Sequence, residues 1–65
     1  MIRKLKQHRE MLGLTQHDLA EDSGVSVMRI AYAESGRTKY RPDEVQRIKR
    51  VLRTRVREIV NTVED

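Results

Sequence analysis

The sequence predicts an all-α fold, a compact domain of four to five helices. The chain has 65 residues with only three glycines and one proline, so little interrupts helical segments. Of its residues, 37% are charged, and most of these are Lys, Arg and Glu, which favour helices. Apolar residues recur at spacings of three and four along the chain. A chain of this length forms one domain, predicted over residues 1–65.

Residues 2–12 are predicted to form the first helix, which carries a charged residue on its apolar side. This stripe consists of Ile2, Leu5, Arg9 and Leu12. A buried charge needs a partner, and Glu34 stands in the same situation on a later helix, four residues after Ile30. We therefore predict a structural ion pair between Arg9 and Glu34.

Two short helices joined by a tight turn are predicted within residues 15–36. Thr15 can cap the first of them, and Asp18 can return a hydrogen bond to the amide of the cap. Gly24 can adopt the positive φ that ends this helix, and Ser26 can cap the next. A helix, a tight turn and a helix with an outward side form a helix-turn-helix, whose second helix fits the major groove of DNA.

The second helix of this motif, residues 26–35, has two unlike sides. Its inward residues at 100° per residue are Ile30, Ala33 and Glu34. The candidates for contact with bases are Val27, Met28, Arg29 and Tyr32. Apolar side chains can contact thymine methyl groups, whereas Arg29 can fork onto a guanine. Arg29 lies to the side of the exposed arc, so a phosphate contact is the alternative for it, and a place in the core is the alternative for Met28.

These residues resemble the Cro/repressor-type helix-turn-helix family, which includes lambdoid phage Cro and repressor DNA-binding domains. The resemblance covers roughly residues 2–53. It rests on Leu12, Gly13, Leu14, Thr15, Gln16, Leu19, Ala20, Gly24, Val25, Ser26, Ile30, Glu34 and Gly36, followed by Arg37, Thr38, Lys39, Arg41 and Pro42. The resemblance implies a lambda-repressor-like fold, a phosphate contact from Gln16 and an ion pair at the positions of Arg9 and Glu34.

Positive charge gathers after the second helix of the motif. Residues 35–57 contain nine Lys/Arg against two Asp/Glu, whereas residues 1–34 contain five of each. Such a stretch suits a polyanion such as DNA, and a merely solvated surface is the alternative reading. The predicted phosphate contacts are Thr15, Gln16, Ser26, Arg37, Lys39 and Arg41.

From Pro42 to the end, neither Gly nor Pro interrupts an apolar stripe. The stripe consists of Val45, Ile48, Leu52, Val56, Ile59 and Val63. One long helix that pairs with a second subunit is the interpretation we favour, and a break near Thr54 that folds the tail back is the alternative. We thus predict a core over residues 2–53 and a self-associating helical tail over 54–65, which makes a homodimer at least on DNA.

Composition argues against several other classes of protein. The chain has no Cys, which excludes disulfides and thiolate metal sites. It has no apolar run long enough for a membrane span or a signal peptide. His8 and His17 fall on different predicted helices without a ligand cluster. We therefore expect no metal, no cofactor, no small-molecule ligand and no enzymatic activity.

Taken together, the sequence predicts a cytoplasmic, sequence-specific regulator of transcription that binds double-stranded DNA, in a bacterial cell or a phage-infected host. One alternative is an excisionase-like architectural protein that binds tandem sites. The other is an adaptor or anti-repressor that uses the same fold to bind protein. Gln16 and three loop cations facing the same way favour DNA, because an adaptor would not need them.

Overall fold

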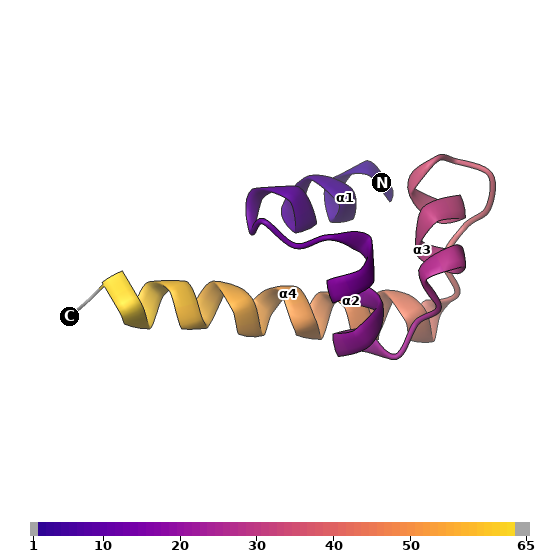
Figure 1. The fold of residues 1–65 in the computed structure, drawn as a ribbon. Helices are drawn as coiled ribbons and strands as arrows, with labels where there is room; N and C mark the ends of the chain where they lie inside the picture. The colour runs from indigo at the N-terminus through magenta and orange to yellow at the C-terminus, as the bar shows by residue number, and fades with distance from the viewer. Residues whose placement is uncertain (1, 64–65) are drawn as a thin grey trace.

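The computed structural model describes the backbone of residues 2–63 and the side chains of residues 5–56. The described chain forms four helices, α1 (Ile2–Met11), α2 (Gln16–Ser23), α3 (Val27–Glu34) and α4 (Pro42–Val63). The long α4 lies along one side of the molecule, and α1 and α2 pack against it (Figure 1). Helix α3 packs against α1 and α2 and is joined to α4 by the loop over residues 35–41. The all-α prediction is confirmed, with four helices.

Capping residues set the boundaries of α2 and α3. The Thr15 hydroxyl accepts a hydrogen bond from the amide of Asp18 at 3.0 Å, and the Thr15 amide donates to the Asp18 carboxylate at 3.0 Å. Gly24 ends α2 with φ of 75°, which a side chain would disfavour. The Ser26 hydroxyl accepts from the amides of the first turn of α3. The predicted helix-turn-helix is therefore confirmed, with the capping residues that the sequence predicts.

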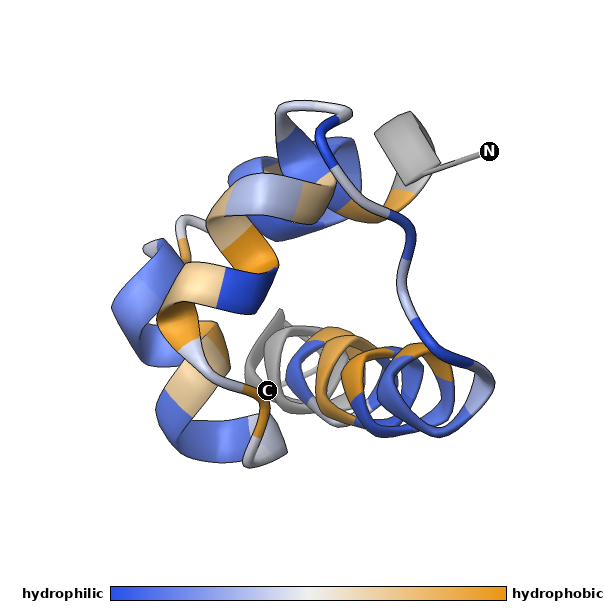
Figure 2. Cartoon of the chain, turned by 90° about the vertical axis from the view of Figure 1, so that its right-hand side faces the viewer, coloured by the Kyte–Doolittle hydropathy of each residue, from blue (hydrophilic) through white to orange (hydrophobic). Residues whose placement is uncertain are grey.

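The core is aliphatic and draws one large, fully buried side chain from each of three helices. These side chains are Leu19 in α2, Ile30 in α3 and Ile48 in α4. Partly buried hydrophobic residues pack against this centre, and hydrophobic positions occur in the helices on both sides of it (Figure 2). Because the chain contains neither Phe nor Trp, the packing of branched aliphatic groups holds α3 against the rest of the domain.

Helix α4 runs without a break from Pro42 to Val63, so the alternative in which the tail folds back near Thr54 is wrong. The Thr54 hydroxyl donates to the carbonyl of Arg50 at 3.0 Å, a bond made within the helix. With neither Gly nor Pro to stop it, the helix extends beyond α1 and α2 (Figure 1). The side chains of residues 57–65, which include Ile59 and Val63 of the predicted stripe, lie outside the described residues.

Candidate nucleic-acid interface

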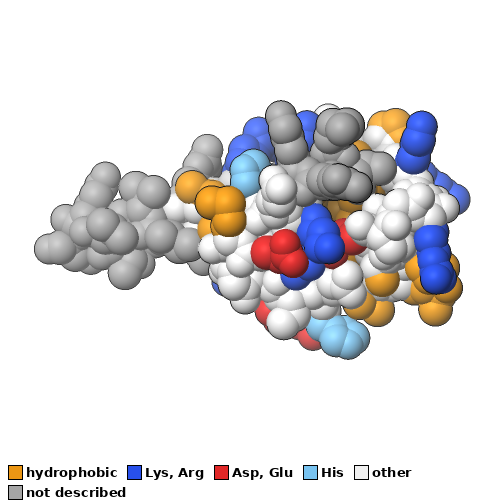
Figure 3. Space-filling view, turned by 90° about the horizontal axis from the view of Figure 1, so that it is seen from above, with side chains coloured by type: hydrophobic (Ala, Val, Ile, Leu, Met, Phe, Trp, Pro, Cys, Tyr) orange, Lys and Arg blue, Asp and Glu red, His pale blue; other side chains and the backbone are white. Residues whose placement is uncertain are grey.

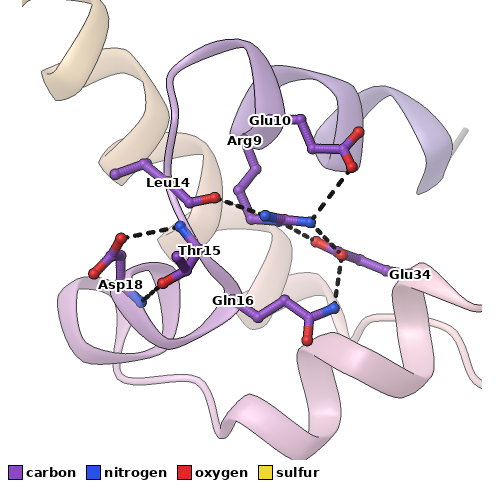
Figure 4. A network of polar contacts seen from close by, with 7 residues as sticks. All are labelled: Arg9, Glu10, Leu14, Thr15, Gln16, Asp18 and Glu34. Carbon is purple, nitrogen blue, oxygen red and sulfur yellow. Dashed lines mark hydrogen bonds and ion pairs between the residues drawn. The ribbon is translucent and has the colours of Figure 1, made fainter.

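A buried ion pair joins α1 to α3 (Figure 4). Arg9 Nε donates to Glu34 Oε2 at 2.7 Å, and Arg9 Nη2 donates to Glu34 Oε1 at 2.9 Å. The Arg9 side chain is 9% exposed and that of Glu34 is 4% exposed. Arg9 Nη1 also donates to the carbonyl of Leu14 at 2.6 Å. The predicted pair is confirmed, and its two parallel hydrogen bonds fix the orientation of α3 relative to α1.

Gln16, the first residue of α2, joins this network from below the pair as drawn in Figure 4. Gln16 Nε2 donates to Glu34 Oε1 at 2.9 Å. Burial acts to raise the pKa of Glu34, but the hydrogen bonds from Arg9 and Gln16 outweigh it, so this pKa lies below its usual value. The side chain predicted to contact phosphate is thus turned toward the ion pair, while its backbone lies at the positive end of the α2 dipole.

Thr15 and Ser26, also predicted to contact phosphate, are the N-caps of α2 and α3. Each hydroxyl oxygen accepts hydrogen bonds from amides of the helix that it caps. The hydrogen bonds found within residues 5–56 do not use either hydroxyl proton. Both residues are exposed, so each can still donate to an oxygen outside the chain. Their contact with phosphate stays a prediction.

The outward side of α3 is apolar. Met28 is 61% exposed and Tyr32 is 42% exposed, while Val27 is partly exposed. The alternative that placed Met28 in the core is therefore wrong. On the inward side, Ile30 and Ala33 are fully buried, as their helical spacing predicts. These opposite sides leave the outward side chains free to meet a partner.

Arg29 is held against the loop and the start of α4. Its Nε and Nη2 donate to the two carboxylate oxygens of Glu44 at 3.1 and 2.8 Å. Nη1 donates to the hydroxyl of Thr38 at 3.3 Å, and Nη2 donates to the carbonyl of Lys39 at 3.1 Å. Four of the five N–H groups of a guanidinium are thus used. Arg29 thus holds the loop against the start of α4. To contact a guanine, its guanidinium would have to give up its hydrogen bonds to Glu44.

The loop between α3 and α4 presents its cations to solvent. Arg37, Lys39 and Arg41 are exposed, whereas Tyr40 between them packs against the core. Burial, the largest cause, raises the pKa of Tyr40 to about 12. The guanidinium of Arg37 lies 5.7 Å from the centre of the Tyr32 ring, within reach of a cation–π contact. Lys, Arg and hydrophobic side chains are exposed side by side at this end of the molecule (Figure 3).

A family model described as helix-turn-helix matches residues 5–59. The chain belongs to the helix-turn-helix family. This is a family of DNA-binding regulators, in agreement with the resemblance to Cro and repressor proteins. No curated protein and no solved structure matches the chain. The helix-turn-helix match includes α2, α3, the loop and most of α4.

Among the described residues of this chain, no group of three or more His, Asp or Glu side chains is arranged to hold a metal ion. None of the helices in the same part of the chain is both long and apolar enough to cross a bilayer.

Sequence reasoning missed the pairing of Arg29 with Glu44, although a signal for it exists. Glu44 precedes Ile48 and Leu52 at spacings of four, so it belongs to the buried side of α4. A carboxylate on the buried side of a helix needs a partner, as the Arg9 guanidinium does. Glu44 also accepts from the amide of Arg41 at 2.8 Å, so it joins α3, the loop and α4 of the helix-turn-helix domain.

We expect Glu44→Gln to weaken the fold at pH 7 and to flatten its dependence on acid. The hydrogen bonds from Arg29 and from the amide of Arg41 lower the pKa of Glu44 to about 2. A carboxyl whose pKa is lower in the folded state stabilises that state above its unfolded pKa. In the parent this stabilisation is lost as the pH falls from about 4.5 toward about 2.

Urea unfolding measured from pH 7 to pH 2 tests this expectation. Glu44→Gln removes the contribution of this carboxylate to stability. Between pH 4.5 and pH 2, the free energy of unfolding of the variant should therefore fall less steeply than that of the parent. Asp43→Asn is the matched control, because Asp43 is exposed in the same helical turn, and it should keep a stability close to the parent's at pH 7. An unchanged pH dependence in Glu44→Gln would contradict the role of this pair.

Proposed function

We propose that this protein is a sequence-specific transcriptional regulator of the Cro or small-repressor type, acting in the cytoplasm of a bacterium or a phage-infected cell. In this proposal α3 enters the major groove and its outward residues meet base edges. The observation that carries it is the exposure of Arg37, Lys39 and Arg41 next to the outward side of α3. Phosphate contacts from these cations would set the register in which α3 meets the bases.

The other predicted phosphate contacts support the same orientation. Thr15 and Gln16 lie at the N-terminus of α2, and Ser26 lies at that of α3. Free amides and the dipole make such an end a suitable place for a phosphate oxygen. Among the hydrogen bonds described for this chain, none uses the amides of Gln16 or His17. We propose that these backbone groups hold one phosphate and that the loop cations hold another.

We expect binding to duplex DNA that is specific and falls steeply with salt. Each phosphate neutralised adds about −0.9 to the slope of log affinity against log salt concentration. Replacing Arg37, Lys39 or Arg41 by Ala should each make this slope shallower by about 1 if that cation meets a phosphate. Fluorescence anisotropy on selected and scrambled duplexes, at several salt concentrations, measures both properties.

Arg53→Ala is the matched control, since Arg53 is an exposed cation on α4, outside the loop. It should leave the salt slope near the parent's. Equal affinity for all duplexes would contradict a specific regulator and would favour an architectural protein. No binding at all, or a response insensitive to salt, would favour an adaptor that recognises protein.

We also propose that the protein acts as a homodimer, at least on DNA, through residues 51–63. Among the side chains described, those of residues 5–56, Leu52 is the last buried residue of the core, and the next residue of the apolar stripe, Val56, is 48% exposed. Helix α4 continues beyond this point. A second copy of the same helix would cover Val56 and set two recognition helices at a fixed separation.

A further inference from the structure

The outward side of α3 combines apolar side chains with a shortage of groups that can donate hydrogen bonds to bases. Val27, Met28 and Tyr32 lie within less than half a turn of the helix surface at 100° per residue. The Met28 side chain is 61% exposed and that of Tyr32 is 42% exposed, so both can contact a partner. The Tyr32 hydroxyl is the only hydrogen-bond donor among these three side chains, and the Met28 sulfur is only a weak acceptor.

The one cation of α3 is not available on this side. Arg29 is the only Lys or Arg in α3, and its guanidinium is bound by both carboxylate oxygens of Glu44. Two further hydrogen bonds join it to Thr38 and to the backbone of Lys39. Replacing these partners by a guanine would strand Glu44, whose carboxylate is 11% exposed, without its main counter-charge.

The edges of the four bases call for different partners. Guanine presents two acceptors that suit Arg or Lys, adenine suits Asn or Gln, and cytosine presents a donor. Thymine alone among the four unmodified bases presents a methyl group in the major groove, and its partner is an apolar side chain. Of these partners, the outward side of α3 offers the apolar side chains that suit the methyl group of thymine.

We infer that α3 reads its DNA site through the C5-methyl groups of thymines, with Met28 as the main specificity-determining residue and Val27 beside it. The DNA that this protein selects should therefore carry thymines in the half-site that faces α3. Arg29 has a positioning role, since it holds the loop whose cations flank this surface. The inference rests on the proposed function and specifies the chemistry of its base contacts.

The test replaces thymine by uracil in the DNA. A duplex bound preferentially by the full chain is first selected from a random pool, and each thymine of the half-site is then replaced singly by deoxyuridine. This change removes the C5-methyl group and keeps the base pair. At one or two positions we expect affinity to fall about fourfold, the effect of exposing one methyl-sized group at about 0.8 kcal/mol.

The variant Met28→Ala tests whether Met28 is the side chain that contacts the thymine methyl group. At the position that Met28 reads, the variant should bind the thymine and uracil duplexes with equal affinity. Met11→Ala is the matched control, because Met11 is 81% exposed at the end of α1, and it should keep the parent's preference for thymine. Both variants replace an exposed methionine in a helix by a strong helix former, so neither should unfold the domain.

Three results would overturn the inference and leave the proposed function standing. The first is a selected site at which no uracil substitution weakens binding. The second is a Met28→Ala variant that keeps the full preference for thymine. The third is a selected guanine whose replacement by 7-deazaguanine weakens binding of the parent but has no further effect on binding of Arg29→Ala. Equal affinity for all duplexes in the selection would instead contradict the proposed function itself.

Discussion

Arg9→Ala and Glu34→Ala should each markedly destabilise the fold and remove a third or more of its free energy of unfolding. Each variant leaves the other charge buried without its partner, which costs on the order of 3–5 kcal/mol. A domain of this size has a total stability of about 3–10 kcal/mol. The surviving side chain is less than a tenth exposed in the parent, so it stays poorly hydrated unless the packing of α1 on α3 loosens.

Chemical unfolding followed by circular dichroism measures this effect, and two further variants make it specific. Glu10→Ala removes a carboxylate that lies 4.0 Å from Arg9 and is 55% exposed, so stability should change by no more than about 1 kcal/mol. The double variant Arg9→Met with Glu34→Leu removes both charges and should recover much of the loss. Single variants that melt like the parent would contradict the buried pair.

The sequence alone was sufficient wherever one helix or one turn decides the structure. The capping residues Thr15 and Ser26 act on amides two or three positions away, so the spacing along the chain already determines their contacts. The Arg9–Glu34 pair was also predictable, because each charge interrupts an apolar stripe that must be buried. To predict that the two side chains contact each other, one had to assume in addition that the apolar stripes of α1 and α3 face one another.

The candidate interface was less accessible to such reasoning, because it depends on how the loop after α3 folds. Arg29 lies beside the exposed arc, and helical periodicity does not tell whether it turns toward DNA or toward Glu44, fifteen residues later. Tyr40 packs inward between two exposed cations, a choice that no repeating pattern encodes. Gln16 likewise turns to Glu34 through a contact that only the packing of α2 on α3 creates.

The helical tail leads to the second large effect. We expect Val56→Asp to abolish self-association and to weaken binding to an inverted-repeat site by about 100-fold or more, because the second half-site is then no longer bound as part of the same dimer. Val56 is 48% exposed, so aspartate is compatible with a folded monomer. A second copy packed on this side of α4 would instead have to bury the new charge.

Thr54→Asp is the matched control for this variant. Thr54 is exposed and lies about half a turn of the helix away from Val56 at 100° per residue, so the same charge there should leave association intact. Ile59→Asp, one step further along the apolar stripe of the sequence, should behave like Val56→Asp if the stripe continues the interface. Circular dichroism establishes that each variant remains helical before its assembly is compared.

Sedimentation and DNA binding then decide between the two modes of action. A dimer should place its recognition helices about 34 Å apart and occupy both half-sites of an inverted repeat cooperatively, whereas the Val56→Asp monomer should fill each half-site independently. Since the charge change lies on α4 and not in the loop or α3, affinity for a single half-site should stay near the parent's. A parent that remains monomeric at high concentration and binds half-sites without cooperativity would exclude the dimer.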